Sequence, residues 1–504
     1  MVTAPGSDSE SSNTKDLVLK FESHPESMDE EVGSTSHPST SIPNLDLIKS
    51  LQHTERDVFY STYWEDICLP ALHPMFKPTS LLTSNSPMLT HAILALASCN
   101  MSRLHAERRD SSRRHMGTYS PNLIHQTRSQ LYYSLAIKDF TSLKQINTKS
   151  SLAFTVLVLF AYIESSMGNF EGFNCHVQGL ERFLAELKDE PGEGSFNALL
   201  TAWMQIRFVV WWARAYFSRL DIHRNLPPVP LPRKLEGRFE TTEERRVNVL
   251  NVMCESHRLN SKAILKHWSH DSDLDDEYEI TYLKLAREAK KLDLWLSNLP
   301  IIEQPSDSES YSHLSSEGGL DRPIFFQSHD AALNFAYYVL ARIMQCTRSL
   351  HHLQNRKLHE ELEHDEEQGW IRLLLQIANG SSMQTSVSKN SYTIGFSGIL
   401  LAVLLRCQDL TLSLEIERWL DFLHALQPTE DGAFPIYQTL GVARMVNQQR
   451  MMGREIYGVS QLEDDGGGFP KFTAYNSQSI SSLLLHGVCN ITGSLFTECV
   501  SIEV

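Results

Sequence analysis

Apolar residues in this chain recur at three- and four-residue steps from about residue 50 onward, a spacing that places them on one face of an α-helix. Runs that alternate apolar and polar residues, as half-buried strands do, are almost missing. The fold class we expect is therefore all-α, a multi-helix array. The helices are predicted near 87–104, 124–143, 151–164, 197–217, 281–299, 329–353, 397–412, 414–426 and 436–452.

Composition sets the N-terminal segment apart from the helical remainder. Residues 1–48 are rich in Ser, Thr, Asp and Glu and hold few large apolar residues, so burial cannot offset the entropy lost on ordering them. We expect a disordered, acidic and Ser-rich tail. Within it, residues 16–32 interleave acids with Leu, Val and Phe, which resembles an acidic activation segment, although an ordinary solvated tail is the simpler interpretation.

Breaks rich in proline, glycine and charge divide the rest of the chain, among them 225–244 and 270–279. The longest polar break follows residue 300, and we expect it to be a mobile insertion between two helical arrays. The expected organisation is an N-terminal helical part at 49–300, a flexible linker at 301–328, a C-terminal helical part of the same domain at 329–458 and a C-terminal segment at 459–504.

Charge and cysteine usage narrow the class of protein. The formal net charge of -16 opposes direct contact with nucleic-acid phosphates, which bind proteins largely through Lys and Arg. The eight cysteines are scattered singly, without a C-x-x-C pair, which favours reduced, buried thiols. The N-terminus lacks the features of a secretory signal, and the longest apolar run, 152–163, is shorter than the ~20 residues of a membrane span. These observations favour the cytosol or the nucleus and no membrane partner.

Two acidic spacings are typical of helical terpene synthases, which hold magnesium between facing helices. Asp275–Glu279 fits D-D-x-x-[DE], and Asn490, Ser494 and Glu498 fit N-x-x-x-S-x-x-x-E. The first cluster is expected in a charged linker, so solvated acids are the preferred interpretation. A magnesium-dependent enzyme is the weakest alternative.

Histidines come close to metal-site spacings without matching one. His359 and His364 are five residues apart, so on a helix they point about 140° away from each other, whereas the zinc-protease signature needs a spacing of four. The pairs His267 and His270, and His351 and His352, have no third ligand nearby in the sequence. Glycine loops that cradle nucleotides are missing as well. We expect surface histidines and no catalytic residue, metal or cofactor.

The densest basic run, 103–115, lies between two predicted helices. Such a run can serve as a nuclear import signal or a phosphate contact, with a solvated loop as the simpler interpretation. Without a recognition helix or a C-x-x-C scaffold, it would add affinity for nucleic acid but no sequence specificity. Its arginines are Arg103, Arg108, Arg109, Arg113 and Arg114.

A series of short motifs carries a family resemblance. It begins with Asp57-Val58-Phe59-Tyr60, Tyr63-Trp64 and Cys68-Leu69-Pro70, and it continues with Ser86-Pro87-Met88-Leu89 before the Ala-rich stretch 91–97. Further along lie Leu131–Ile137, similar to a YY-x-x-A-[IL] helix, and Cys175–Leu180, similar to an H-[LV]-x-G step. This order resembles the fungal-specific transcription factor domain, the regulatory region of fungal binuclear zinc-cluster transcription factors. His176 and Gly179 are then expected to be packing residues, with Gly179 allowing close helix–helix contact.

The resemblance covers roughly residues 52–450. It implies a nuclear, α-helical region that mediates dimerisation, inhibition or effector response and usually follows a six-cysteine zinc cluster that binds DNA. Residues 1–50 contain no cysteine, so direct DNA binding by this chain is in doubt. An upstream exon that encodes the cluster could also be missing from the gene model.

The function we expect is that of a fungal transcriptional regulator in the nucleus. It would act through contacts with other transcription factors or coregulators, as a homodimer or heterodimer, on a secondary-metabolite or nutrient-pathway gene set. The main alternative, from a different class, is a non-transcriptional α-helical scaffold.

Overall fold

The computed structural model divides the chain into two units, Met1–Leu51 and Gln52–Val504. The first unit, and with it the expected tail at 1–48, lies outside the described residues. The structure describes residues 53–77, 86–105, 107–108, 119–142, 150–186, 194–216, 218–268, 275–306, 322–353, 360–426, 430–432, 434–462 and 482–501.

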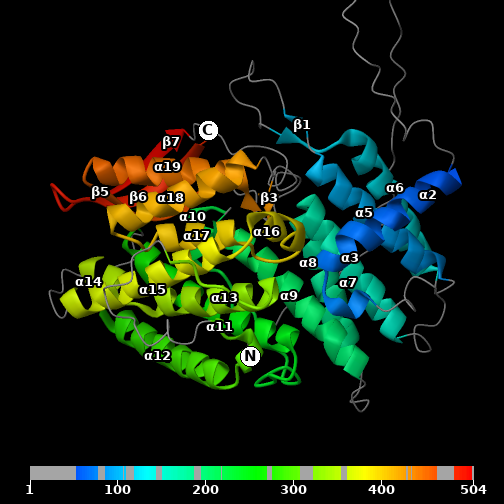
Figure 1. Ribbon diagram of the computed structural model, residues 1–504, viewed down its shortest axis with the longest axis horizontal. Coiled ribbons are helices and arrows are strands. Elements are labelled where there is room, and N and C mark those ends of the chain that lie inside the picture. The colour runs from blue at the N-terminus through cyan, green and yellow to red at the C-terminus, as the bar shows by residue number, and fades with distance from the viewer. Residues whose placement is uncertain are drawn as a thin grey trace, which may run out of the picture. The chain divides into compact units, whose positions relative to one another are not determined.

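Helices dominate the described part of the second unit, which confirms the predicted all-α class (Figure 1). In the N-terminal half they are α2 (His53–Tyr63), η1 (Trp64–Cys68), α3 (Leu69–Ala71), η2 (Pro74–Phe76), α5 (Pro87–Leu104), α6 (Leu123–Thr141), α7 (Ser150–Met167), α8 (Phe170–Glu186), α9 (Gly194–Tyr216) and α10 (Leu220–Arg224). They continue as α11 (Thr242–Leu265), η4 (Lys266–Trp268), α12 (Asp275–Ser297), η5 (Ile301–Glu303), α13 (His329–Gln345), α14 (Arg348–Leu353), α15 (Glu360–Gly380), α16 (Met383–Lys389), α17 (Phe396–Leu404), α18 (Leu410–Ala425) and α19 (Ile436–Met451).

Two predicted helices end earlier than their apolar spacing indicates. The helix expected at 329–353 is divided into α13 and α14, because Cys346 adopts an extended backbone with ψ of 135°. The helix expected at 397–412 ends at Leu404, and α18 then starts afresh after Asp409, whose carboxylate accepts the Leu412 N–H at 3.0 Å. A capping carboxylate of this kind fixes where a helix begins.

The motifs of the family resemblance join α2, α5, α6, α7 and α8 through aromatic hydroxyl groups. The Tyr60 hydroxyl shares a hydrogen bond with His125 at 2.9 Å. The Tyr133 hydroxyl donates to Glu164 at 2.5 Å and lies 2.7 Å from His176 Nε2, so His176 packs inside this group as expected. Each bond satisfies polar atoms that burial would otherwise leave without water.

Gly179 does not have the role predicted for it. It lies in α8, on an exposed position, and a Cβ atom added there would meet no other atom within 4 Å. The expectation of close helix–helix contact at Gly179 is therefore wrong.

The longest helix, α11, packs against α9, α10, α12, α13, α14 and strand β5 (Arg454–Ser460). The apolar spacing does not indicate this helix, and the break expected at 225–244 overlaps its start. Thr241 and Glu244 form a reciprocal capping box at its N-terminus, with the Thr241 hydroxyl accepting the Glu244 N–H at 3.1 Å. This T-x-x-E pattern is the sequence signal that would have predicted the start of α11.

The expected linker at 301–328 is ordered at both of its ends. Glu303 is buried and receives hydrogen bonds from Arg245 and Thr242 of α11, while the Ile324 N–H donates to the Gln376 carbonyl of α15 at 3.0 Å. Residues 307–321 lie outside the described part. The description of 301–328 as flexible throughout is corrected at 301–306 and 322–328, because these buried bonds hold both ends.

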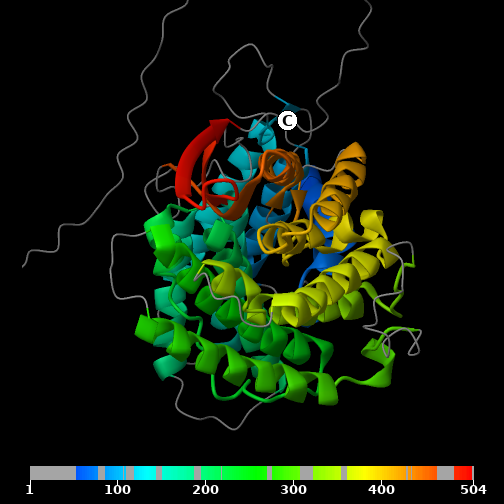
Figure 2. The ribbon, with the colours of Figure 1, turned by 90° about the vertical axis from the view of Figure 1, so that its left-hand side faces the viewer.

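The C-terminal segment contains strands that the sequence analysis did not predict. Strand β5 pairs antiparallel with β6 (Ser482–Cys489), which pairs antiparallel with β7 (Leu495–Ser501). Figure 2 shows β6 and β7 in red, and β5, in orange like α19, packs against that helix. Most residues of β5 and β6 are buried in succession, so they lack the alternation by which a half-buried strand is recognised. The other described strands are two residues long and pair antiparallel: β1 (Glu107–Arg108) with β2 (Tyr119–Ser120), and β3 (Glu430–Asp431) with β4 (Phe434–Pro435).

The burial of the cysteine thiols and the absence of a membrane span are two further expectations. All eight cysteines are free, but Cys175 and Cys499 are exposed, so the expectation of buried thiols fails for these two. No helix among the described residues combines the length and the hydropathy required to cross a bilayer.

Because several histidines are buried, we predict that the free energy of unfolding falls on mild acidification. Burial lowers the pKa of His73 and of His223 from 6.5 to about 3, and that of His486 to about 4. The unfolded chain binds protons at these sites below pH 6.5 and the folded chain does not, so stability present above pH 6.5 is lost as the pH falls toward 4. Each histidine contributes about 1.4 kcal/mol per pH unit in this window.

Urea unfolding at pH 7.5, 6 and 5 measures this loss. The variant His223→Gln is expected to show a shallower fall of the unfolding free energy with pH than the unsubstituted protein. His105→Gln, which changes an exposed histidine, is the matched control and should keep the original slope. Equal slopes for all three proteins would contradict the prediction.

Candidate functional site

Of the basic patch predicted from the sequence, the structure describes the side chain of Arg103. Arg103 lies in the last turn of α5, where it is 8% exposed and forms an ion pair with Glu430 of β3. Its interpretation as an import or phosphate contact is wrong, because burial beside Glu430 leaves no access for a partner. Arg108 lies in β1, and Arg109, Arg113 and Arg114 lie outside the described residues.

The two acidic clusters lie on different kinds of structure. Asp275–Glu279 forms the start of α12 rather than a linker, which corrects the expected context. Asn490 and Ser494 lie at the turn between β6 and β7, and Glu498 is in β7, where it pairs with Arg454 at 2.5 Å. The second motif needs a helix to bring its three side chains to one face, and residues 490–498 form a turn and a strand instead. Within the described ranges, no three His, Cys, Asp or Glu residues gather as metal ligands.

Three of the histidines singled out by spacing, His267, His351 and His352, lie among the described residues and have protein partners. His352 is exposed, as expected, and shares a hydrogen bond with the Tyr457 hydroxyl at 2.5 Å. His267 is half-buried and shares a hydrogen bond with Tyr278, so its description as a surface histidine is corrected. His270 and His359 lie outside the described residues, as does the side chain of His364.

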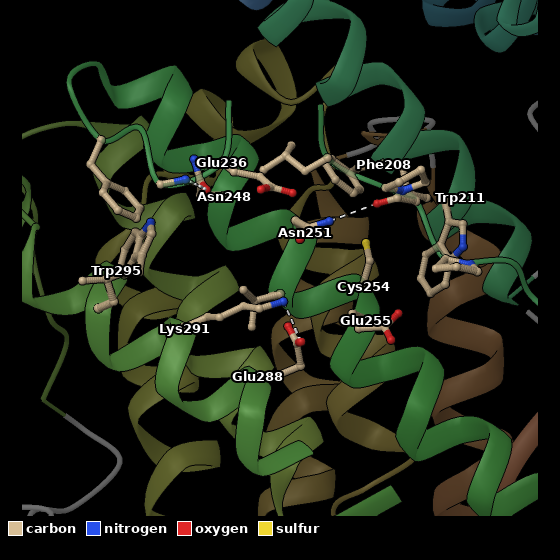
Figure 3. A pocket seen from close by; sticks show the side chains of 18 residues that line it. Phe208, Trp211, Glu236, Asn248, Asn251, Cys254, Glu255, Glu288, Lys291 and Trp295 are labelled. Carbon is tan, nitrogen blue, oxygen red and sulfur yellow. Dashed lines mark hydrogen bonds and ion pairs between the residues drawn. The ribbon is translucent and has the colours of Figure 1, made fainter. Parts of the chain in front are cut away.

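A pocket of about 490 Å³ opens between α9, α11, α12 and the proline-rich segment 227–239 (Figure 3). This volume lies within the range of small-molecule sites. Figure 3 shows side chains from facing elements converging on the pocket: Phe208 and Trp211 from α9, Asn248, Asn251, Cys254 and Glu255 from α11, Glu288, Lys291 and Trp295 from α12, and Glu236 from the proline-rich segment.

Hydrogen bonds to backbone carbonyls hold the proline-rich wall in place. The Trp211 indole N–H donates to the Pro227 carbonyl at 2.8 Å, and the Asn251 amide donates to the Val229 carbonyl at 3.0 Å. The Asn248 amide donates to the carbonyls of Leu235 and Arg238, at 3.2 and 2.9 Å. Prolines cannot donate backbone hydrogen bonds, so a segment this rich in proline depends on side chains from α9 and α11 for its conformation.

Glu288 is the most unusual group in the pocket. It is 5% exposed, and its Oε1 accepts a hydrogen bond from Lys291 Nζ at 2.7 Å. Its Oε2 is buried without a hydrogen-bond partner among the described residues. Burial raises the pKa of Glu288, Lys291 opposes that shift, and the neighbouring Glu255 adds to it. A buried carboxylate oxygen without a donor carries a desolvation cost that a ligand N–H or O–H can relieve.

The other groups of the pocket indicate binding rather than covalent chemistry. Burial raises the pKa of the Cys254 thiol well above 9.0, so the thiol stays protonated and is a poor nucleophile. Glu255 is occupied by Arg258, whose guanidinium contacts both carboxylate oxygens at 2.7 Å. What remains is an apolar, aromatic wall, the buried Oε2 of Glu288 and the exposed carboxylate of Glu236.

None of these pocket residues was predicted as a site residue. The proline-rich wall lies within the break expected at 225–244, and α11 was not predicted. Two signals are present in the sequence: four prolines between residues 227 and 232, which favour a loop, and the T-x-x-E pattern at 241–244, which favours a helix start after it.

The fold and the pocket define an all-α body with a small-molecule-sized cleft. No protein-family model matches the chain, and neither a curated protein nor a solved structure is significantly similar to it.

The buried pair of Arg103 and Glu430 predicts a large stability loss on substitution. Glu430→Gln leaves the Arg103 charge buried without its counter-charge, so the free energy of unfolding should fall by about 3–5 kcal/mol. Arg103→Met should cost a similar amount, and the double substitution should recover part of the loss, because neither charge then remains alone. Urea unfolding of the four proteins measures this cycle.

The control for this cycle is Arg219→Met, which breaks an exposed pair with Asp221. It should change stability by at most about 1 kcal/mol. A loss at Arg103 no larger than at Arg219 would instead agree with an exposed basic patch.

The wall of the pocket predicts a local effect of Asn248→Ala. This change removes the bonds to the Leu235 and Arg238 carbonyls, and each unsatisfied group costs about 1–3 kcal/mol. Trypsin should then cleave faster at Arg233, Lys234 or Arg238, as read by mass spectrometry. Asn225→Ala removes one exposed bond to the Asp221 carbonyl and should leave the cleavage rate unchanged. Equal rates for both variants would show that Asn248 does not hold the wall.

Proposed function

We propose that the chain is a fungal transcriptional regulator that acts in the nucleus through protein contacts, on a secondary-metabolite or nutrient-pathway gene set. The order of family-like motifs between residues 57 and 180 supports this proposal, and some of their residues, among them Tyr60, Trp64 and Tyr133, are buried where α2, α5, α6, α7 and α8 pack together. The net charge of -16 favours contacts with proteins over contacts with DNA phosphates.

The outer face of α12 is the surface feature that gives this proposal its strongest support. Its residues 280, 283, 287, 290 and 294 follow one another at three- and four-residue steps, so they share one side of the helix. Ile280, Leu283 and Leu294 on this face are 49%, 68% and 53% exposed. Arg287 and Lys290 are exposed beside them, and Lys284 flanks them. We call these six residues the α12 outer face.

The α12 outer face combines apolar and basic residues in a chain that is strongly acidic overall. Exposed apolar residues that cluster on a soluble protein mark interaction sites, and basic residues select an acidic partner. Segments that interleave acids with hydrophobic residues are typical of activation regions. The partner we propose is such an acidic, amphipathic segment of another transcription factor or coregulator.

A reporter assay tests the proposal. Fused to an unrelated DNA-binding domain, the protein should change reporter output in the nucleus. Leu283→Glu places a negative charge on the α12 outer face, and it should reduce the effect about fivefold or more, because it removes an apolar contact and repels an acidic partner. Leu283 is exposed, so the free energy of unfolding should stay the same.

Leu414→Glu is the matched control, since it makes the same substitution at an exposed leucine of α18. It should retain full reporter output. Exclusion of the protein from the nucleus together with no reporter effect would contradict the proposal and favour the scaffold alternative. Equal effects of Leu283→Glu and Leu414→Glu would reject the α12 outer face as the contact.

A further inference from the structure

The pocket between α9, α11 and α12 has an unsatisfied acceptor. Glu288 Oε2 is buried at a residue that is only 5% exposed, and Lys291 satisfies only the other oxygen. Figure 3 shows the Glu288 carboxylate directed toward the pocket, with Lys291 at its side. A ligand that enters the pocket with a hydrogen-bond donor would give Glu288 Oε2 the hydrogen bond that it lacks.

The charges of the lining decide which donor fits. Three carboxylates line the pocket, those of Glu236, Glu255 and Glu288. Arg258 neutralises Glu255 from outside and Lys291 pairs with Glu288, which leaves one negative charge in excess. An anionic ligand would be repelled, a neutral alcohol would leave the excess in place, and a single positive charge would neutralise it.

The apolar part of the lining suits the same ligand. Phe208, Trp211 and Trp295 present aromatic rings to the pocket. Aromatic rings attract cations through their faces, most strongly where water is excluded, and they also bury the apolar body of a ligand. The volume of about 490 Å³ suits a molecule with one or two rings.

We propose that this pocket binds a small organic monocation, an amine with an aromatic or alicyclic body, whose ammonium group donates a hydrogen bond to Glu288 Oε2. The pocket shares Leu294 with the α12 outer face but none of its other five residues, and the inference holds whether or not the chain regulates transcription. The amine binds without covalent change.

Calorimetric titration of the full chain with three matched probes tests the inference. The probes are 4-phenylbutylamine, 4-phenylbutanol and 4-phenylbutanoate, which share one body and differ in the charge of the head group. At pH 7.5 the amine should bind about tenfold or more tightly than the alcohol, and the carboxylate should bind most weakly. No binding of the amine at about 10 mM, or binding of the carboxylate as tight as that of the amine, would overturn the inference.

Two variants assign the effect to the pocket. Glu288→Gln keeps the shape but removes the charge, so it should weaken amine binding about tenfold and change alcohol binding little. Glu236→Gln alters an exposed carboxylate, which keeps the fold intact, and should weaken amine binding about two- to fivefold. Glu279→Gln makes the same change on an exposed position of α12 outside the pocket and should have no effect. Amine affinity unchanged in both Glu288→Gln and Glu236→Gln would place the binding elsewhere and reject this site.

Discussion

The pairing of polar side chains on α11 is the constraint on which the rest of the second unit depends. Because α11 is covered on several sides, its polar residues must find partners inside the protein. Arg245 bonds Glu303 at 2.8 Å, Arg246 bonds Asp330 at 2.7 Å, and the Tyr216 hydroxyl lies 2.7 Å from His257. Each partner belongs to a different segment, so satisfying α11 fixes the registers of η5, α13 and α9 at once.

The same constraint attaches the C-terminal strands and leaves room for the pocket. Arg406 is buried and donates to Asn260 of α11 at 2.7 Å and to the Tyr457 carbonyl of β5 at 3.0 Å, so one guanidinium joins the helix to the sheet. On another side of α11, Asn248 and Asn251 use their amides to hold a proline-rich wall away from the helix surface. A wall held by its backbone carbonyls leaves space between side chains, and the pocket occupies that space.

The helices that can be predicted from the sequence are those whose buried surface is mainly apolar. Helices α5, α6 and α19 are predicted to within two residues. In α5 apolar side chains at helical steps lie on the buried face, whereas α6 buries His125 and Ser129 and exposes Leu131. Helix α11 buries Arg245, Asn260 and His257, so its periodicity is hidden by residues that normally face solvent. Strands β5 and β6 are buried along most of their length and lack alternation. The burial of Arg103 could not be predicted from its sequence neighbours, because its counter-charge, Glu430, lies 327 residues away in the sequence. The α9–α11–α12 pocket depends on such distant partners and could not be assembled from local patterns.

Lys291 connects the two proposed binding surfaces on α12. Its ammonium pairs inward with Glu288, yet its side chain is 49% exposed and lies next to Lys290 of the α12 outer face. An ammonium group on Glu288 Oε2 would lie near the Lys291 ammonium on Oε1, and the repulsion between the two charges would weaken the hold on Lys291 and favour its turning toward the outer face. An acidic partner on the outer face would attract Lys291 outward and would thereby favour the amine at Glu288. Linkage requires the two effects to be equal in free energy, so amine and acidic segment would each tighten the binding of the other. In this arrangement the unpaired Oε2 of Glu288 and the basic α12 outer face would be coupled through Lys291.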